Sequence, residues 1–412
     1  MTDQQYLTTE EYQEAFGIDQ QTLATELTKI LVSHGYDMDS SSMKLRRLDH
    51  ISINPKSRVY VVSESGSQLA RMSPPLIIRK LMDVETMGGL ERASDEFAVQ
   101  DAVLKANNQC LREPHMFIDR TGQITAFPPY YNGSEVFRNQ NIQVMNFLTG
   151  SSLEDTLKLA TTPGNRTELQ LISDALDPML VLVRFLGLDK KVVDIETTLG
   201  QKLPQVNPTS IKEKMLRHLR IIDQKYFVSR ERELSEQIGT LANKLENETK
   251  YASVMMQGDG RPKHYYSNSL VDPRIVVGPL SMQVGYLLCN SSVLWPRERN
   301  GTNALKDYLR ILEEKDEKIK TRDRIEGIHR VGSAEFYQNV LLAGLVQCLE
   351  SVAGIEFYLG RHIKTAEQSQ AYTQQRERET KFALNYLSLL KNLGTISTHT
   401  FRSLDRVVRP SN

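Results

Sequence analysis

The stretch MMQGDGRPKHYYSNSLVDPRIVVG, residues 255–278, carries the strongest indication of fold and chemistry in this chain. It places Asp259 in a loop rich in Gly, Arg, Pro and Lys, and then a β-rich run with a second isolated carboxylate, Asp272. Gly and Pro beside Asp259 also fit a plain turn, and Asp272 before Pro273 fits a strand end with local hydrogen bonds. The order of loop, strand and second carboxylate favours a functional pair.

The composition is that of an ordinary globular chain without a strong global charge. Its 412 residues are 40% hydrophobic, and 51 Lys and Arg residues balance 51 Asp and Glu residues. A chain of this length buries a large core and commonly forms two or three lobes. Because the charges balance, no global field attracts nucleic acid or an anionic membrane, and we expect neither partner.

Cysteine content and hydropathy predict a cytoplasmic protein without membrane segments. Cys110, Cys289 and Cys348 lie far apart without metal-ligand spacing, so we expect buried, reduced thiols. The polar, acidic N-terminal segment does not resemble a signal peptide. No stretch reaches the roughly 18 uninterrupted apolar residues that a membrane span requires.

The chain changes from β-rich to helical periodicity part-way along its length. Residues 1–40 predict a helical N-terminal extension with a capping box at Thr9. Residues 41–150 predict a small β-rich, nucleotide-binding lobe with the element order β-β-β-α-β-β. Residues 151–412 predict a helical lobe, interrupted by the β-rich part of 255–278. The expected fold class is therefore α+β, with a small antiparallel β lobe and a large helical lobe.

Three further motifs follow one another in an informative order. The strand LIIRKL (76–81) ends in basic residues, SDEFAVQDAVL (94–104) follows on a helix, and QVMNFLTGSSLED (143–155) reads as a strand leaving the lobe. In this order they resemble the aminoglycoside phosphotransferase and choline kinase superfamily, as a divergent member with a two-lobe, protein-kinase-like fold. The resemblance covers about residues 40–400, and the strand from 143 is its clearest match.

The resemblance implies roles for the residues of the opening stretch. The family's catalytic loop reads His-Gly-Asp with an Asn further on, where this chain has Gln257, Asp259 and His264. Asp259 would orient the attacking hydroxyl and accept its proton, and Asp272 would bind the metal ion on the nucleotide phosphates. Arg261 would stabilise charge in the transition state. Phosphoryl transfer needs such positioning and charge neutralisation more than covalent chemistry.

Two positions of this stretch depart from the family pattern. His264 replaces an amide, so its metal contact would favour Mn²⁺ beside the usual Mg²⁺; the alternative is a hydrogen-bonded histidine without metal. Gln283 falls where an Asp usually anchors the catalytic loop. Part of the surroundings of the site is therefore expected to differ from the family.

The β-rich lobe is expected to bind the nucleotide. Arg79 and Lys80 point to opposite faces of a strand, so only one contacts the phosphates. The kinase-like pattern VAIKKL favours Arg79, whereas the preference for an ammonium favours Lys80. Glu96 would pair with that basic residue, unless it is an exposed helix carboxylate. Met145 and Phe147 would line the adenine, unless they belong to an ordinary buried strand.

The resemblance implies an enzyme, a phosphotransferase that moves a phosphoryl group from ATP or GTP to a hydroxyl of a small molecule with Mg²⁺ or Mn²⁺. The alternative is a catalytically inactive kinase-like scaffold that binds a nucleotide or, through the charged segment 229–250, a protein partner. The sequence predicts no particular acceptor, no choice between ATP and GTP, and no oligomeric state.

Overall fold

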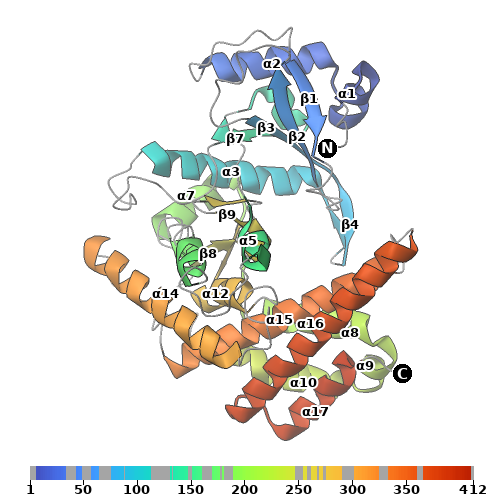
Figure 1. Ribbon diagram of the computed structural model, residues 1–412, viewed down its shortest axis with the longest axis vertical. Coiled ribbons are helices and arrows are strands. Elements are labelled where there is room, and N and C mark those ends of the chain that lie inside the picture. Colours follow the sequence, from blue (N-terminus) through green and yellow to red (C-terminus); the bar gives the residue numbers. More distant parts are fainter. Residues whose placement is uncertain are drawn as a thin grey trace. The chain divides into compact units, whose positions relative to one another are not determined.

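Figure 1 shows the chain as a computed structural model that divides into two compact units. The β unit comprises Met1–His115, Ala126–Gly150 and Asp194–Gln201, and the helical unit comprises Met116–Thr125, Ser151–Val193 and Lys202–Asn412. The structure describes residues 6–33, 43–48, 57–64, 76–87, 89–112, 130–131, 133–146, 151–159, 169–176, 179–180, 189–245, 254–257, 261–266, 269–271, 275–289, 301–323, 333–359 and 365–409.

The β unit is built on a five-stranded antiparallel sheet with the strand order β1-β2-β3-β7-β6. Its strands are β1 (Met43–Arg47), β2 (Ser57–Glu64), β3 (Leu76–Leu81), β6 (Tyr130–Tyr131) and β7 (Ile142–Asn146). On β3, Ile78 lies opposite Tyr60 and Val144, and Arg79 lies opposite Gln143. The three strands expected before the helix are β1, β2 and β3 of this sheet, and β6 and β7 follow the helix.

One face of this sheet is covered by α1 (Thr9–Phe16) and α2 (Gln20–Ser33) (Figure 1). Their apolar side chains share one core with the sheet, because strand alternation turns Ile78 and Val144 toward them. The capping box of α1 lies at Thr8, whose hydroxyl accepts a bond from Glu11 N, and not one residue later at Thr9. Both N-terminal helices therefore belong to the hydrophobic core of the β unit.

The opposite face of the sheet packs against α3 (Ala93–Arg112), where Leu81 meets Ala93 and Phe97. A hairpin that the sequence did not reveal, β4 (Val84–Thr86) and β5 (Gly89–Glu91), leads into this helix. Asp83 Oδ1 accepts a bond of 2.7 Å from Ala93 N and so fixes the first turn of α3. The short helix α4 (Glu135–Asn139) precedes β7.

The helical unit is organised around one long apolar helix, α15, which packs against α8, α12 and α16 (Figure 1). Its described helices include α5 (Leu153–Leu159), α8 (Pro208–Ile222), α9 (Gln224–Ser229), α10 (Glu231–Ala242), α12 (Leu280–Leu288), α14 (Gly301–Asp323), α15 (Ala334–Leu359), α16 (Ala366–Asn392) and α17 (Thr398–Val408); α7 (Asp189–Leu199) spans the division between the units.

Helices α12 and α15 cross with their backbones almost in contact. A Cβ atom at Gly285 would lie 2.4 Å from Ala343 Cβ and 2.7 Å from the Val340 carbonyl oxygen. A Cβ atom at Gly344 would lie 2.5 Å from Cys289 Cβ. Real Cβ atoms do not approach so closely, so glycine at both positions is what permits this crossing.

Helix α15 is long and apolar enough over Ala334–Phe357 to cross a membrane, yet 72% of its most apolar stretch is buried inside the structure. This burial is that of a core helix. The expected burial of Cys289 and Cys348 is confirmed, and burial raises the pKa of the Cys289 thiol to about 12. The side chain of Cys110 lies outside the described residues.

Candidate functional site

The opening stretch folds as two short antiparallel pairs in the helical unit. Strand β8 (Val254–Gln257) pairs with β11 (Ile275–Gly278), and Gln257 lies opposite Ile275. Asp259 follows Gln257 by two positions, and Asp272 precedes Ile275 by three. Both carboxylates lie outside the described residues. Each strand of this pair therefore lies within three positions of a predicted site carboxylate along the chain: β8 of the catalytic Asp259, and β11 of the metal-binding Asp272.

The second pair, β9 (Tyr265–Tyr266) with β10 (Ser269–Leu270), is preceded by a 3-10 turn, η5 (Pro262–His264). The His264 amide donates to the Arg261 carbonyl at 2.9 Å, and the His264 carbonyl accepts from the Val271 amide at 2.9 Å. These bonds place buried His264 beside Val271, the residue just before Asp272. Among the described residues, no three His, Cys, Asp or Glu side chains gather to hold a metal ion, so the metal contact of His264 stays a prediction.

Arg261 reaches a cluster of charged side chains that sequence reasoning missed. Its Nη2 lies 3.9 Å from Glu350 Oε1 on α15, and Glu350 Oε2 lies 2.6 Å from Lys214 Nζ on α8. Lys214 also donates 3.1 Å to the hydroxyl of Tyr286 on α12. The three charged side chains are 22–27% exposed. The cluster therefore joins three helices to the segment that leaves the predicted catalytic loop.

The charges of this cluster stabilise one another. Burial alone would raise the pKa of the Glu350 carboxyl, but Lys214 and Arg261 outweigh it and hold that pKa well below its usual range. Burial alone would lower the pKa of Lys214, but Glu350 raises it. The neighbouring His218, 1% exposed on α8, has its pKa lowered to about 4 by burial and then by Lys214 and nearby arginines, against the effect of Glu350. At neutral pH the cluster thus combines charged Glu350 with a neutral imidazole.

A second contact connects the β9 segment to α12. Gln283, fully buried on α12, donates 2.8 Å to the hydroxyl of Tyr265. At the position where the family pattern has an Asp, this chain therefore uses a neutral amide bonded to a tyrosine. On α5, Asp155 approaches Tyr266, whose pKa is raised by burial and then by this carboxylate. Asp155 was not among the expected site residues.

In the β unit, the structure connects two of the predicted nucleotide-binding residues. Arg79 on β3 is 6% exposed, and its Nη1 donates to Gln100 Oε1 on α3 at 2.9 Å. Gln100 Nε2 in turn donates to Glu96 Oε1, one turn earlier on the same helix, at 2.7 Å. Gln100 therefore connects Arg79 to Glu96. Sequence reasoning missed this residue, although its i, i+4 spacing from Glu96 places both on one helix face.

Lys80 lies on the other face of β3 and has different partners. Its ammonium donates to the Phe16 carbonyl at 3.3 Å and to the Gln140 carbonyl, at the C-terminal ends of α1 and α4. A cation at these positions is favourable because the last carbonyls of a helix lack partners within the helix. Burial lowers the pKa of Lys80. These contacts give Lys80 a structural role.

Strand β7 carries the predicted adenine-lining residues beside Arg79. Met145 is buried, and Gln143 on the same face is fully buried directly opposite Arg79. Within the described part of the chain, neither amide atom of Gln143 has a hydrogen-bond partner. Phe147 lies outside the described residues. The face of β3 and β7 turned toward α3 therefore combines a cation, an amide and apolar side chains.

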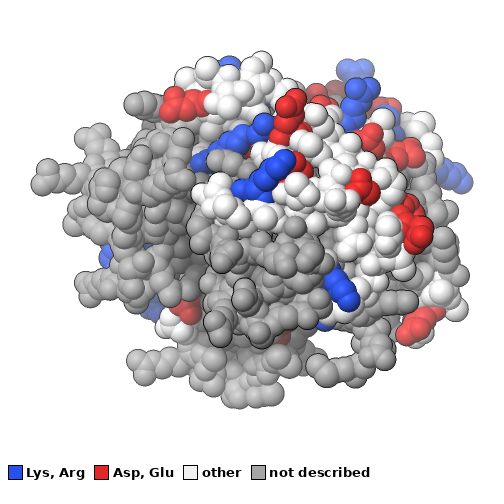
Figure 2. Space-filling view, turned by 90° about the horizontal axis from the view of Figure 1, so that it is seen from above, with Lys and Arg blue, Asp and Glu red and all other residues white. Residues whose placement is uncertain are grey.

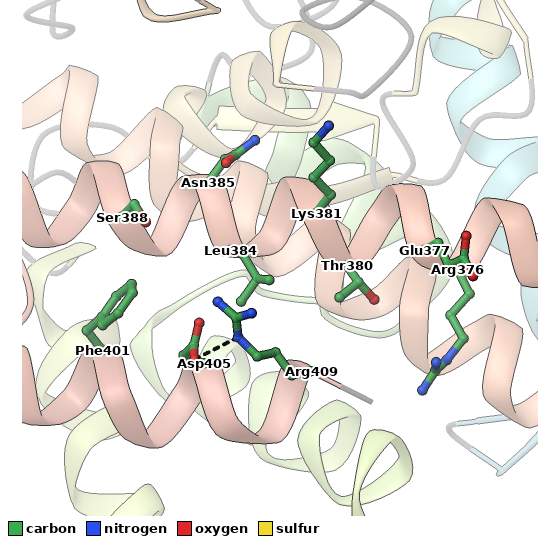
Figure 3. A pocket seen from close by; sticks show the side chains of 10 residues that line it. All are labelled: Arg376, Glu377, Thr380, Lys381, Leu384, Asn385, Ser388, Phe401, Asp405 and Arg409. Carbon is green, nitrogen blue, oxygen red and sulfur yellow. Dashed lines mark hydrogen bonds and ion pairs between the residues drawn. The ribbon is translucent and has the colours of Figure 1, made fainter. Parts of the chain in front are cut away.

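A pocket of about 440 Å³ lies elsewhere in the helical unit, between α16 and α17 (Figure 3). Phe401 and Leu384 line it together with polar side chains of both charge signs, and Asp405 pairs with Arg409 across its edge. None of the predicted site residues lines it.

Charges also alternate in sign on the face shown in Figure 2, where the described Lys and Arg side chains are interspersed with Asp and Glu.

Comparison with solved structures identifies the fold. Choline kinase from Cryptosporidium parvum Iowa II superposes with a TM-score of 0.52 at 10% identity, covering 93% of this chain and 99% of that chain. This chain has the choline kinase fold. Ethanolamine kinase from Plasmodium vivax gives 0.47 at 10% identity, covering 90% and 95%, and a choline/ethanolamine kinase family protein from Mesorhizobium loti gives 0.45 at 11%, covering 94% and 98%. The sequence matches no protein-family model and no curated protein.

The choline kinase fold confirms the expected α+β class with a small β lobe and a large helical lobe. The resemblance to the aminoglycoside phosphotransferase and choline kinase superfamily, inferred from degenerate motifs, is confirmed at the level of the fold. At 10% identity the likeness does not carry residue roles.

Proposed function

We propose that the protein transfers the terminal phosphoryl group of ATP or GTP to a hydroxyl group of a small molecule. The observation that carries this proposal is the connection Arg79–Gln100–Glu96 in a chain with the choline kinase fold. A buried guanidinium on β3, fixed by a helix that bears a carboxylate, is suited to bind nucleotide phosphates through charge-assisted hydrogen bonds. Its neighbour Met145 would contact the base.

The chemical step is assigned to the loop between β8 and η5. Asp259 accepts the proton of the acceptor hydroxyl while that oxygen forms a bond to the γ-phosphorus, and the bond to the β,γ-bridging oxygen breaks. The electron pair of the broken bond leaves with the nucleoside diphosphate. Arg261, on the same loop, stabilises the charge that the phosphoryl oxygens carry in the transition state.

The metal ion expected for such a reaction fits the described residues only in part. Mg²⁺ prefers oxygen ligands, whereas buried His264 offers an imidazole nitrogen that suits Mn²⁺ better. The described residues do not form a magnesium site by themselves, and the role of Asp272 as its ligand rests on the sequence resemblance. A bound metal would neutralise phosphate charge; no step above depends on it.

An inactive, nucleotide-binding scaffold is the second candidate. The observation that favours it is the neutral Gln283–Tyr265 contact, which stands where the family pattern has a charged anchor for the catalytic loop. Retained nucleotide binding without turnover would select this candidate. The charged cluster of Arg261, Glu350 and Lys214 argues for the enzyme, because it supplies a charged contact to the same loop segment.

The deciding experiment compares wild type with Asp259→Asn and Asp272→Asn. We expect Asp259→Asn to bind ATP as wild type does, because the amide keeps the shape of the side chain, while turnover falls by about 10²–10⁴-fold. Asp272→Asn should lose the metal dependence of nucleotide affinity. Binding is measured by thermal shift with ATP or GTP and Mg²⁺ or Mn²⁺, and turnover by nucleoside diphosphate release. Full turnover by Asp259→Asn would exclude its assigned role.

A further inference from the structure

The carboxylate of Glu350 occupies an unusual place in the helical unit. It lies on α15, where the other residues from Val340 to Ile355 are buried and apolar except for buried Gln347 and partly buried Ser351 and Gly354. A carboxylate placed in such a helix costs free energy unless charged partners compensate it. Glu350 has two such partners from different parts of the chain, Lys214 and Arg261.

The two partners of Glu350 belong to different parts of the helical unit. Lys214, at 2.6 Å, belongs to a helix of the core and is itself held by Tyr286. Arg261, at 3.9 Å, belongs to the segment that begins η5 and whose carbonyl accepts the His264 amide. Glu350 therefore connects α8 and α15 of the helical unit to the segment two residues beyond Asp259.

We propose that Glu350 is a positioning residue that anchors Arg261, and through it the loop carrying Asp259, to the helical core. The catalytic part of this proposal rests on the proposed phosphotransferase function; the anchoring part does not. Glu350 touches neither nucleotide nor acceptor in this proposal. It acts by fixing the guanidinium in one place, so that no reorganisation is needed when charge develops on the phosphoryl group.

The chain contains a matched control on the same helix. Glu356 of α15 pairs with Arg376 of α16 and is 26% exposed, compared with 22% for Glu350. Both substitutions, Glu350→Gln and Glu356→Gln, remove the charge of a partly buried carboxylate that pairs with an arginine. Only the first removes a contact with the η5 segment. A difference between the two variants at that segment therefore measures anchoring and not general loss of ion pairing.

The first readout is hydrogen exchange of residues 261–271 in the full-length protein, which requires no enzymatic activity. We expect Glu350→Gln to accelerate exchange of the His264 and Val271 amides roughly 10-fold, while Glu356→Gln leaves them unchanged. If Glu350→Gln does not fold, Arg261→Gln removes the other half of the pair and leaves Lys214 bonded to Glu350, with the same expected acceleration. Equal exchange in wild type and in the variant that folds would overturn the proposal.

The second readout is steady-state kinetics. We expect Glu350→Gln to lower kcat about 10–100-fold with the KM for nucleotide within about 2-fold of wild type, and Glu350→Asp to recover part of the loss because it retains the charge. A raised KM with unchanged kcat would overturn the catalytic part. Faster exchange in Glu350→Gln, together with a wild type that shows no turnover, would sustain the anchor and refute the proposed function instead.

Discussion

Arg79 in the β unit and Arg261 in the helical unit are held by different kinds of partner. Arg79 is connected to Glu96 through the neutral amide of Gln100, whereas Arg261 approaches Glu350 directly in a cluster with Lys214. An amide between two charges does not titrate, and its burial costs less free energy than the burial of a charge. Charges packed together depend on one another and on the protonation state of each member.

This difference predicts that acidification, or removal of a charged side chain, lowers the stability of the helical unit more than that of the β unit. Glu350, Lys214 and His218 have pKa values shifted by one another and by burial. A neutral connection such as Gln100 instead fixes the geometry of Arg79 without adding a further titrating group. Each of the following predictions tests one side of this comparison.

The largest expected effect is the loss of stability on acidification that His218 causes. Its pKa is about 4 in the folded protein against 6.5 ordinarily, so the unfolded chain takes up a proton that the folded chain excludes. The free energy of unfolding should fall by about 3 kcal/mol as pH decreases from 6.5 to 4, and His218→Leu should abolish this part of the loss. Urea titrations at several pH values measure it.

Glu350 adds a second loss with the same sign at lower pH. Its pKa is depressed in the folded protein, so its stabilising effect is complete above the ordinary value of 4.5 and declines as pH falls below it. The two contributions are separable because His218 acts in the higher pH range. An acid dependence that is the same in wild type and in His218→Leu would contradict the assignment.

The next effect in size concerns Arg79 and Lys80, adjacent on β3. Arg79→Ala should weaken ATP binding by roughly 1.5–3 kcal/mol, or about 10–100-fold in Kd, because a charge-assisted phosphate contact is lost. Lys80→Ala should leave ATP affinity unchanged and lower the thermal midpoint, because the carbonyls of Phe16 and Gln140 lose their donor. Isothermal titration and thermal unfolding separate the two outcomes. Weaker ATP binding in Lys80→Ala alone would reverse the assignment.

The smallest effect is expected at Gln143, opposite Arg79. Both amide atoms of this fully buried side chain lack a partner among the described residues. Gln143→Leu should therefore raise the free energy of unfolding by about 1 kcal/mol, because the desolvation cost of the amide disappears. Thermal unfolding of the two proteins measures the change. Destabilisation would indicate that the amide is hydrogen-bonded in solution and belongs to the Arg79 connection.

The elements of the fold were predictable because local patterns carry them. Strand alternation, helical spacing and turn residues identified the sheet, α3 and the helices after residue 300. The hairpin β4–β5 was missed because its strands have three residues each, too few for an alternation pattern. The sequence placed Arg79 and Lys80 on opposite faces, but it could not say which face meets α3, since that depends on tertiary packing.

The site was predictable where residues are close in sequence and unpredictable where distant elements meet. Gln100 could have been identified from the sequence, because it lies one helical turn from Glu96. Glu350 lies 89 positions after Arg261 in an apolar run that also contains Glu356, and no spacing rule distinguishes the two carboxylates. Only the crossing of α8, α12 and α15 brings Glu350 to Lys214 and Arg261. Sequence periodicity does not encode such a crossing.

The two contacts of Lys80 have a consequence for any attempt to shorten the protein. Residues 1–40, expected as an extension, provide the Phe16 carbonyl for the Lys80 ammonium and, with Tyr12, part of the core beneath the sheet. A protein truncated before β1 would expose the apolar face of the sheet to water and leave this ammonium with one fewer acceptor. Loss of nucleotide binding after such a truncation would then report a misfolded β unit, and it would be no sign of a regulatory tail.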